Sequence, residues 1–198
     1  ALVQGAVKEI VAHERARGVR ELSGDPLLTQ GVDDLPRRDR RKIGVRTSGH
    51  DRLVRRLFTR VCSGILSIAA SLMGAKETYA IDIDPVAARV AAENAELNGI
   101  DMSGYFIRIG DILSDEKFRD DISGRQYDIV LANIVANVII AFAPVIPQLM
   151  KPDGKLIASG IIADRLDEVL DALKANGLEA VEICSGEDWR AVLAAKIS

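Results

Sequence analysis

The strongest constraint on this 198-residue chain is a regular alternation of short apolar runs with longer amphipathic stretches after residue 61. The apolar runs have strand length and lie at 78–83, 105–109, 127–132, 155–161, 178–184 and 189–197. Helical spacing of apolar residues marks the segments 64–73, 85–98, 135–150 and 164–176. Strands that alternate with helices predict an α/β fold, with a doubly wound and mostly parallel sheet covered on both faces.

Both ends of the second helix are marked by residues that start and stop helices. Asp84 is a good N-cap, Pro85 suits the first turn, and Gly99 suits the position after the last turn. The apolar residues of this helix, Val86, Val90 and Leu97, are predicted to share one face. The last two apolar runs have only SGED between them, which predicts a C-terminal antiparallel hairpin.

Composition divides the chain near residue 60. Residues 1–60 carry 14 Lys and Arg against 8 Asp and Glu, whereas residues 61–198 carry 12 against 21. The domain assignment is therefore a basic, irregular segment over 1–60 and an α/β domain over 61–198. Within the first part, residues 1–17 are predicted to form a helix, 23–41 a polar loop, and 51–58 a short helix or strand.

Several classes of protein are excluded by composition. The longest apolar stretch, Val135–Met150, is interrupted by Asn137, Pro144, Pro147 and Gln148, so no membrane span is predicted. The charged N-terminus has no apolar centre of the kind found in signal peptides. Two cysteines and two histidines provide neither a disulfide framework nor a metal site. A monomer in the cytoplasm is expected, with no bound metal.

Doubly wound sheets bind ligands beyond the carboxyl ends of their strands, so candidate residues are those that follow strands. Asp82 ends the second predicted strand, where a carboxylate can accept hydrogen bonds from both hydroxyls of a ribose. The alternative is a surface or helix-capping aspartate. Because Asp84 already fills the capping position, Asp82 has no evident local partner, and ribose binding is favoured.

Asp111 and Asn133 follow the next two strands. Asp111 is predicted either to accept a hydrogen bond from an adenine amino group or to close an Asx-turn in its own loop. Asn133 offers a donor and an acceptor at the mouth of a pocket, and it is also a good N-cap for the helix that follows.

The segment TRVCSG, residues 59–64, occupies the place of a phosphate or cofactor loop. It lacks the G-x-G-x-x-G pattern, which disfavours a nucleotide-dependent oxidoreductase. Gly64 at a helix start can still present backbone N–H groups to a carboxylate. Cys62 and Cys184 are expected to be small apolar residues rather than nucleophiles, because no histidine is near either in sequence.

Arginines at 37, 38, 40, 41, 52, 55 and 56 form a basic run. Such a run attracts nucleic acid electrostatically, but no aromatic residue is interleaved with it. A solvated surface is therefore favoured over a nucleic-acid interface.

The segment from Ser63 to the end resembles the class I S-adenosylmethionine-dependent methyltransferases, and within them the PrmA-type ribosomal protein methyltransferases. The resemblance rests on the strings SGILSIAASLMGA, AIDIDPVAARVAAENAELNGI, YDIVLANIVANVI, LMKPDGKLIASGI and EDWRAVLAAK. It implies a Rossmann-like methyltransferase fold with seven strands. It also implies S-adenosyl-L-methionine as cofactor and a ribosomal protein, methylated on amino groups, as substrate.

The resemblance also implies roles for single residues. Gly64 is the glycine of the family's cofactor loop that this chain keeps, and Asp82 would hold the cofactor ribose. Asp111 or its neighbours would border the adenine, and Asn133 would lie at the end of the cofactor that carries the methyl group. No catalytic residue is assigned beyond these four cofactor-binding positions.

The chain departs from the family at the loop that follows the first strand. The family pattern D-x-G-x-G-S-G aligns with Phe58, Arg60 and Cys62 at its aspartate and first two glycines. Strained backbone at such positions costs about 1–3 kcal/mol, so impaired cofactor binding is expected. A non-catalytic domain that keeps the fold is the alternative. A reading-frame shift over about residues 30–62 would explain the departure, and sequencing the coding DNA tests it.

Overall fold

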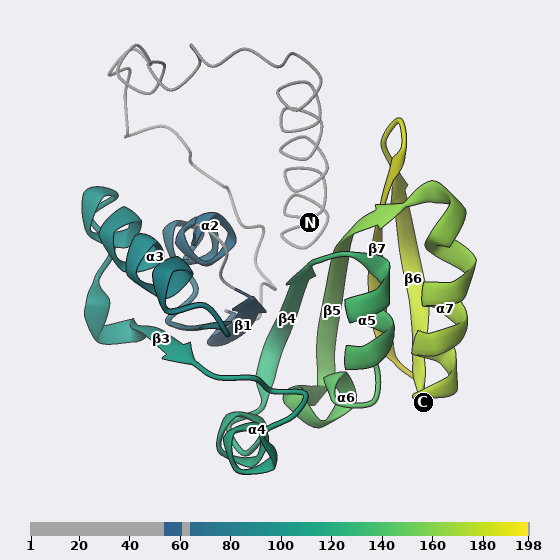
Figure 1. Ribbon diagram of the computed structural model, residues 1–198, viewed down its shortest axis with the longest axis horizontal. Helices are drawn as coiled ribbons and strands as arrows, with labels where there is room; N and C mark the ends of the chain where they lie inside the picture. Colours follow the sequence, from purple (N-terminus) through teal and green to yellow (C-terminus); the bar gives the residue numbers. More distant parts are fainter. Residues whose placement is uncertain (1–53, 61–63, 198) are drawn as a thin grey trace, which may run out of the picture.

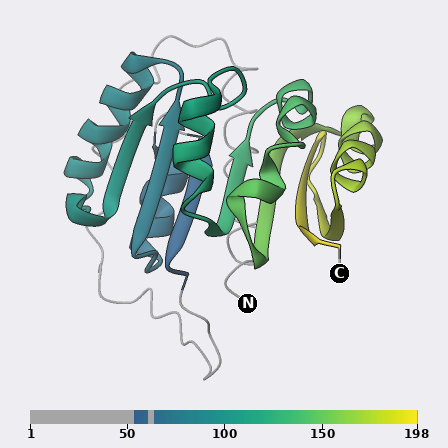
Figure 2. The ribbon, with the colours of Figure 1, turned by 90° about the horizontal axis from the view of Figure 1, so that it is seen from below.

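The computed structural model describes residues 54–60 and 64–197, and these form one seven-stranded sheet with helices on both faces (Figures 1 and 2). The strand order is β3-β2-β1-β4-β5-β7-β6. All neighbours are parallel except β7, which is antiparallel to both β5 and β6. The predicted α/β class, the seven strands and the antiparallel C-terminal hairpin are confirmed.

One half of the sheet follows a simple strand–helix succession. Its elements are β1 (Arg56–Arg60), α2 (Ile65–Leu72), β2 (Glu77–Asp82), α3 (Pro85–Leu97), η1 (Met102–Gly104) and β3 (Tyr105–Ile109). The predicted start of α3 is confirmed, because the Asp84 side chain accepts a hydrogen bond from Val86 N at 2.8 Å. Gly99, with φ of 66°, follows the end of the helix as predicted.

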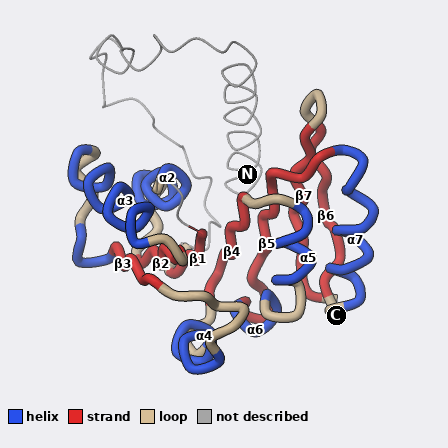
Figure 3. Tube along the Cα trace, in the orientation of Figure 1, coloured by secondary structure: helices blue, strands red, loops and turns tan. Residues whose placement is uncertain are grey.

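The other half carries the remaining helices and the hairpin (Figure 3). Its elements are α4 (Glu116–Ser123), β4 (Tyr127–Asn133), α5 (Ala136–Phe142), α6 (Ile146–Leu149), β5 (Met150–Ile162), η2 (Ala163–Arg165), α7 (Leu166–Ala175), β6 (Leu178–Ser185) and β7 (Trp189–Lys196). The predicted apolar face of α7 is confirmed, since Val169 and Leu173 are buried in the core.

Successive residues of the central strand β1 face opposite sides of the sheet. Leu57 packs in a cluster with Leu66 and Ala70 of α2. Phe58 packs in the larger cluster, which includes Ile122 of α4 and residues of α5, α6 and α7. Helices α2 and α3 therefore cover one face, and α4 to α7 cover the other, which is the two-sided arrangement that parallel strands require.

Three predictions about helices are wrong. The segment 135–150 is not one helix, because Pro144 and Pro147 cannot continue a helical hydrogen-bond ladder, and α5 and α6 form separately. Helix α4 was not predicted, although Asp115 caps it by accepting from Phe118 N at 3.0 Å. The third error concerns α3, whose buried face consists of Ala88, Ala91 and Ala95.

The buried face of α3 is made of alanines because they let the helix approach α2 and the sheet closely. Val86 and Leu97, predicted to share an apolar face, are instead 56% and 80% exposed. The larger side chains therefore lie on the outer side of the helix, and the periodicity of the big apolar residues misidentified its inner face.

The sheet begins before the compositional boundary at residue 60. Strand β1 pairs with β2 from Arg56 to Arg60 and with β4 from Leu57 to Thr59, so it occupies the centre of the sheet. Strand β1 therefore lies within the segment 1–60 that composition sets apart, and a strand is the correct alternative for residues 56–58. The predictions for residues 1–17 and 23–41 lie outside the described residues.

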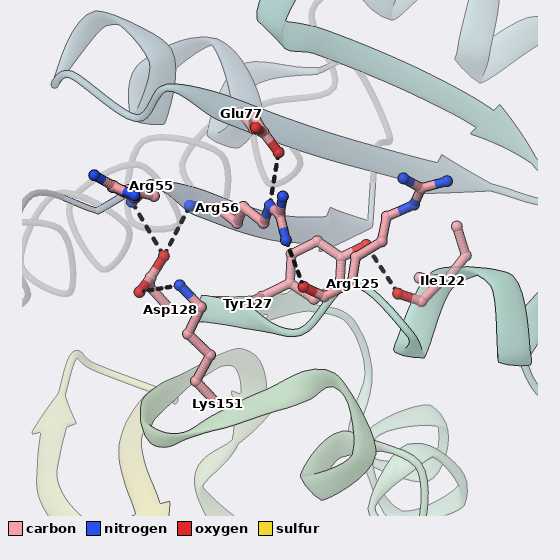
Figure 4. Close-up of polar contacts among 8 residues, drawn as sticks. All are labelled: Arg55, Arg56, Glu77, Ile122, Arg125, Tyr127, Asp128 and Lys151. Atoms are coloured by element: carbon pink, nitrogen blue, oxygen red, sulfur yellow. Dashed lines mark hydrogen bonds and ion pairs between the residues drawn. The ribbon is translucent and has the colours of Figure 1, made fainter.

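A polar network joins the amino ends of the central strands (Figure 4). The Asp128 carboxylate on β4 accepts backbone N–H bonds from Arg55 at 3.1 Å and Arg56 at 2.8 Å, and a bond from Lys151 Nζ at 2.7 Å. Arg56 in turn donates to Glu77 Oε2 at 2.7 Å and to the carbonyl of Arg125 at 2.8 Å. The network thereby connects β1, β2, β4 and β5.

The pKa of the Asp128 carboxyl is lower than its ordinary value. Partial burial alone would raise this pKa, but the hydrogen bonds from Lys151 and from the backbone N–H groups of Arg56 and Arg55 outweigh it. Because the folded-state pKa lies below the unfolded one, the carboxylate stabilises the fold above the unfolded pKa. This contribution is lost as the pH falls through the folded-state pKa.

We expect Asp128→Asn to lower the free energy of unfolding at pH 7 by about 1–3 kcal/mol, measured by urea denaturation, because a charge-assisted bond to Lys151 is lost. The difference from the parent protein should narrow below about pH 4, where the carboxylate protonates in the unfolded chain. Asp171→Asn, at an exposed position of α7, is the control and should change stability little. A difference in unfolding free energy between Asp128→Asn and the parent that stays constant with pH would contradict the role assigned to the Asp128 carboxylate.

Candidate functional site

A cavity of about 230 Å³ lies at the carboxyl ends of β1, β2 and β4. Strand β1 sits between β2 and β4, and the succession of strands reverses direction there, so the cavity is at the topological switch point of the sheet. Its walls are mostly apolar, and the lining residues are Phe58, Ile81, Asp82, Ile83, Gly110, Asp111, Ile112, Leu113, Leu131, Ala132, Ile134, Val138 and Phe142.

Asp82 is the last residue of β2 and lies in the cavity wall with only 7% of its surface exposed. Its Oδ1 accepts the backbone N–H of Asp84 at 3.1 Å, and its main-chain carbonyl accepts that of Gly110 at 3.0 Å. The prediction that Asp82 has no local partner is therefore wrong. A carboxylate offers about four acceptor positions, so this turn contact is compatible with hydrogen bonds to a ligand.

Asp111 follows β3 and also lies in the cavity wall. Its Oδ1 accepts from Leu113 N at 2.9 Å and its Oδ2 accepts from Ser114 Oγ at 2.6 Å. Of the two alternatives that the sequence left open, the Asx-turn is present. The turn presents Ile112 and Leu113 to the cavity, and the adenine role of this segment stays a prediction.

The loop around Asp111 packs tightly against α4 at Gly110. A Cβ on Gly110 would lie 2.8 Å from the Phe118 ring of that helix. A side chain at this position would therefore push the loop away from α4 and change the shape of the cavity wall.

Asn133 is the last residue of β4, in register with Ser159 of β5. It is not an N-cap, because Val135 occupies that position of α5 and makes no side-chain capping bond. The Asn133 side chain instead extends toward Gly160 of β5. A Cβ on Gly160 would lie 3.0 Å from Asn133 Oδ1 and 3.0 Å from the main-chain oxygen of Ile134.

Gly64 caps the start of α2 with a left-handed φ of 81°. Its carbonyl accepts hydrogen bonds from Ser67 Oγ at 2.7 Å and from Ile68 N at 2.9 Å. A Cβ there would lie 3.0 Å from Ala91 Cβ and 3.3 Å from the hydroxyl of Tyr105, which is itself hydrogen-bonded to Ser67. Both the backbone conformation and the close approach of α3 therefore require glycine.

Phe58 on β1 takes the place where the family pattern has aspartate. Its side chain is 3% exposed and lines the cavity. The ring stacks on Phe142 at a centroid distance of 5.9 Å and meets the edge of Tyr127 at 5.5 Å. Phe58 therefore makes this part of the cavity wall aromatic and apolar.

Sequence reasoning missed the apolar lining of the cavity and Gly160. Ile83 and Ile112 directly follow the two predicted aspartates, so their proximity to the site was available from spacing. Val138 and Phe142 come from α5, which only the tertiary structure brings over the carboxyl end of β1. A lone glycine within a strand is a signal for a bulge, and Gly160 has that signal.

Several other predictions from the sequence concern residues away from the cavity. Cys184 is half-buried beside an apolar cluster, as expected of a small apolar residue. Arg56, from the basic run, is engaged in the network at the amino ends of the strands. Cys62 and arginines 37, 38, 40, 41 and 52 lie outside the described residues.

No three His, Cys, Asp or Glu side chains among residues 54–60 and 64–197 are grouped so as to hold a metal ion. Within the same part of the chain, every helix is too short or too polar to cross a membrane.

The sequence model of the family described as ribosomal protein L11 methyltransferase (PrmA) matches residues 61–197. Curated proteins of that name from Acetivibrio thermocellus and Heliobacterium modesticaldum are 46% and 45% identical to the chain over 131 and 132 residues. The alignments cover 66% and 67% of this chain but 39% of each relative, so the chain spans about two fifths of their length.

Solved structures agree with this assignment. The ribosomal protein L11 methylase from Lactobacillus delbrueckii subsp. bulgaricus has a TM-score of 0.67 at 27% identity, covering 76% of this chain and 73% of that one. A TehB-like SAM-dependent methyltransferase from Corynebacterium glutamicum, at 16% identity and a TM-score of 0.57, covers 74% and 82% and shares the fold. Because the family model matches well over half of its residues, this chain belongs to the ribosomal protein L11 methyltransferase (PrmA) family.

Proposed function

We propose that this chain is the catalytic part of an S-adenosyl-L-methionine-dependent protein methyltransferase that transfers methyl groups to amino groups of a ribosomal protein. One observation carries the proposal: a buried carboxylate, Asp82, ends β2 in the wall of an apolar cavity at the switch point of the sheet. Family membership supports both the cofactor and the class of substrate. A site in the cytoplasm, where ribosomes are made, follows from this substrate.

The cavity suits the adenosine half of the cofactor. Asp82 would accept hydrogen bonds from the ribose hydroxyls, and the apolar side chains of Ile83, Ile112 and Leu113 would contact the flat adenine ring. At about 230 Å³ the cavity is smaller than the 300–1,000 Å³ of most ligand pockets, so it accommodates only part of the cofactor. Gly64 at the start of α2 would lie beside the methionine half.

The amino group that receives the methyl would bind near Asn133. Asn133 Oδ1 and the main-chain oxygen of Ile134 both approach Gly160, each 3.0 Å from the position that its Cβ would take, so two acceptors lie near one another at this end of β4. Two acceptors suit the N–H groups of a neutral amine and direct its lone pair away from them. When bound, the sulfonium of the cofactor supplies an electrophilic methyl group.

The transfer needs little covalent chemistry from the protein. The two oxygens would hold the amine with its lone pair toward the methyl carbon, and the bound cofactor would supply the methyl group and keep the electron pair of the C–S bond as a neutral thioether. The amine becomes cationic in this step, and the carbonyl oxygens at Asn133 and Ile134 stabilise the developing charge through their N–H bonds. The product then loses a proton to water. Positioning therefore provides most of the rate enhancement.

The same site is expected to bind its cofactor more weakly than relatives with the full glycine pattern do. Phe58 in the middle of β1 offers no carboxylate, and its buried ring stacks on Phe142 in the core. This feature favours the second candidate, a methyltransferase-fold domain without catalytic activity. Titration calorimetry distinguishes the two: micromolar binding of S-adenosylhomocysteine supports the enzyme, and no heat at millimolar ligand supports the non-catalytic domain.

Asp82→Asn should weaken binding of S-adenosylhomocysteine by about 10- to 100-fold, because hydrogen bonds from a sugar to a charged acceptor contribute about 1.5–3 kcal/mol. Titration calorimetry measures the change. Asp101→Asn, which alters a similar turn-closing aspartate at the start of η1, is the matched control and should bind as the parent does. Equal affinity of the Asp82 variant and the parent would refute the ribose role.

Asn133→Ala should lower kcat about 100-fold or more and leave the Kd of S-adenosylhomocysteine unchanged, because the carboxamide would contact only the amine. Methyl transfer from radiolabelled cofactor to ribosomal protein L11 measures kcat. Asn137→Ala removes a carboxamide one turn into α5, where it accepts from Arg165 Nη2 at 2.8 Å, and serves as the control. A loss of cofactor affinity equal to the loss of kcat would contradict this assignment.

A further inference from the structure

The pairing of β5 with β7 is interrupted where β5 passes Asn133. The register shifts between Ala158 and Ile161, and Gly160 within this irregularity has a left-handed φ of 79°. Bulges of this kind bend a strand and redirect side chains, and they are frequent next to active sites. Gly160 therefore lies in a bulge-like irregularity of β5, opposite the end of β4.

The irregularity brings the backbone of Gly160 against the end of β4, with no room for a side chain. A Cβ at Gly160 would lie 3.0 Å from Asn133 Oδ1, 3.0 Å from the Ile134 oxygen and 3.3 Å from the Ile134 carbonyl carbon. These contacts are tighter than ordinary van der Waals separations, and two of the three involve backbone atoms that cannot move without shifting β4. Ile134 is held in addition by its N–H bond to the Ser159 carbonyl at 3.1 Å.

We propose that Gly160 is a positioning residue for methyl transfer, because only the absence of a side chain there lets the Asn133 carboxamide keep its position. The proposal rests on the function proposed above, since it concerns the same amine-binding carboxamide. A methyl group at this position would displace the carboxamide. A misplacement of about 1 Å at a reacting group costs about 100-fold in rate.

A purely structural role for Gly160 makes a different prediction, and the chain provides a matched control. Gly177 follows α7 with a φ of 77°, and a Cβ there would have nothing within 4 Å. Alanine at either position therefore meets similar backbone strain, but only Gly160→Ala meets Asn133 and the Ile134 backbone. Differences between the two variants therefore report on these contacts rather than on the strain, and the Asn133→Ala background below separates the two contacts.

The first test needs no activity. The side-chain amide signals of Asn133 in a ¹⁵N-labelled protein are assigned by their loss in Asn133→Asp. We expect these signals to move in Gly160→Ala and to stay in place in Gly177→Ala, with or without S-adenosylhomocysteine. Unchanged Asn133 signals in Gly160→Ala, or equal changes in both variants, would overturn the proposal.

The second test is a double-mutant cycle on kcat with ribosomal protein L11 as substrate. Gly160→Ala should lower kcat about 100-fold with an unchanged Kd for S-adenosylhomocysteine, whereas Gly177→Ala should leave kcat unchanged. In the Asn133→Ala background, the Gly160→Ala change should cost little more, because residues that act as a unit are not additive. Full additivity would overturn the proposal.

Two further outcomes are decisive. If Gly160→Ala destabilises the protein, its melting temperature is compared with that of the double variant Asn133→Ala/Gly160→Ala. A higher melting temperature in the double variant supports the contact with the carboxamide, and an equal or lower one refutes it. If the parent protein neither binds the cofactor nor transfers methyl groups, the proposed function fails. The amide signals of Asn133 still decide whether Gly160 positions this side chain.

Discussion

The sheet depends on the contact by which Asp128 holds the start of β1. Strand β1 has only five residues, two of them arginine, yet it lies between β2 and β4 at the centre of the fold. The Asp128 carboxylate binds two backbone N–H groups at its amino end, and Lys151 balances the charge. Burial of the carboxylate opposes its ionised form, so the three hydrogen bonds are needed together. With β1 anchored there, its carboxyl end lies at the switch point that contains the cavity.

The amino and carboxyl ends of the strands carry different kinds of polar groups. At the amino edge, charged groups satisfy one another, since Arg56 bonds to Glu77 and to the Arg125 carbonyl. At the carboxyl edge, Asp82 and Asp111 border an apolar cavity. Phe58 joins this cavity to the core, because its ring lines the cavity and stacks on Phe142.

Local signals in the sequence were sufficient where a single residue type settles the backbone. Asp84 begins α3 and Gly99 follows its end as predicted, because capping and left-handed conformations are decided within a few residues. The local signals failed where the structure of a segment depends on contacts with residues far away in the sequence. Strand β1 lies outside the stretch that matches the family, and only pairing with β2 and β4 makes its residues a strand. The inner face of α3 is alanine because another helix approaches it, and periodicity does not contain that information.

The sequence by itself determined the fold class, the strand-end positions of Asp82, Asp111 and Asn133, and the family, because these follow from alternation, spacing and motif. The tertiary structure decided what those residues meet. It closed Asp111 into a turn, gave Asp82 a partner in Asp84, and set Asn133 against a bulge in β5. The physical reason is clearest for Asn133, whose contact depends on how β4 and β5 are registered at the edge of the sheet. Register is a property of packing between segments far apart in the chain.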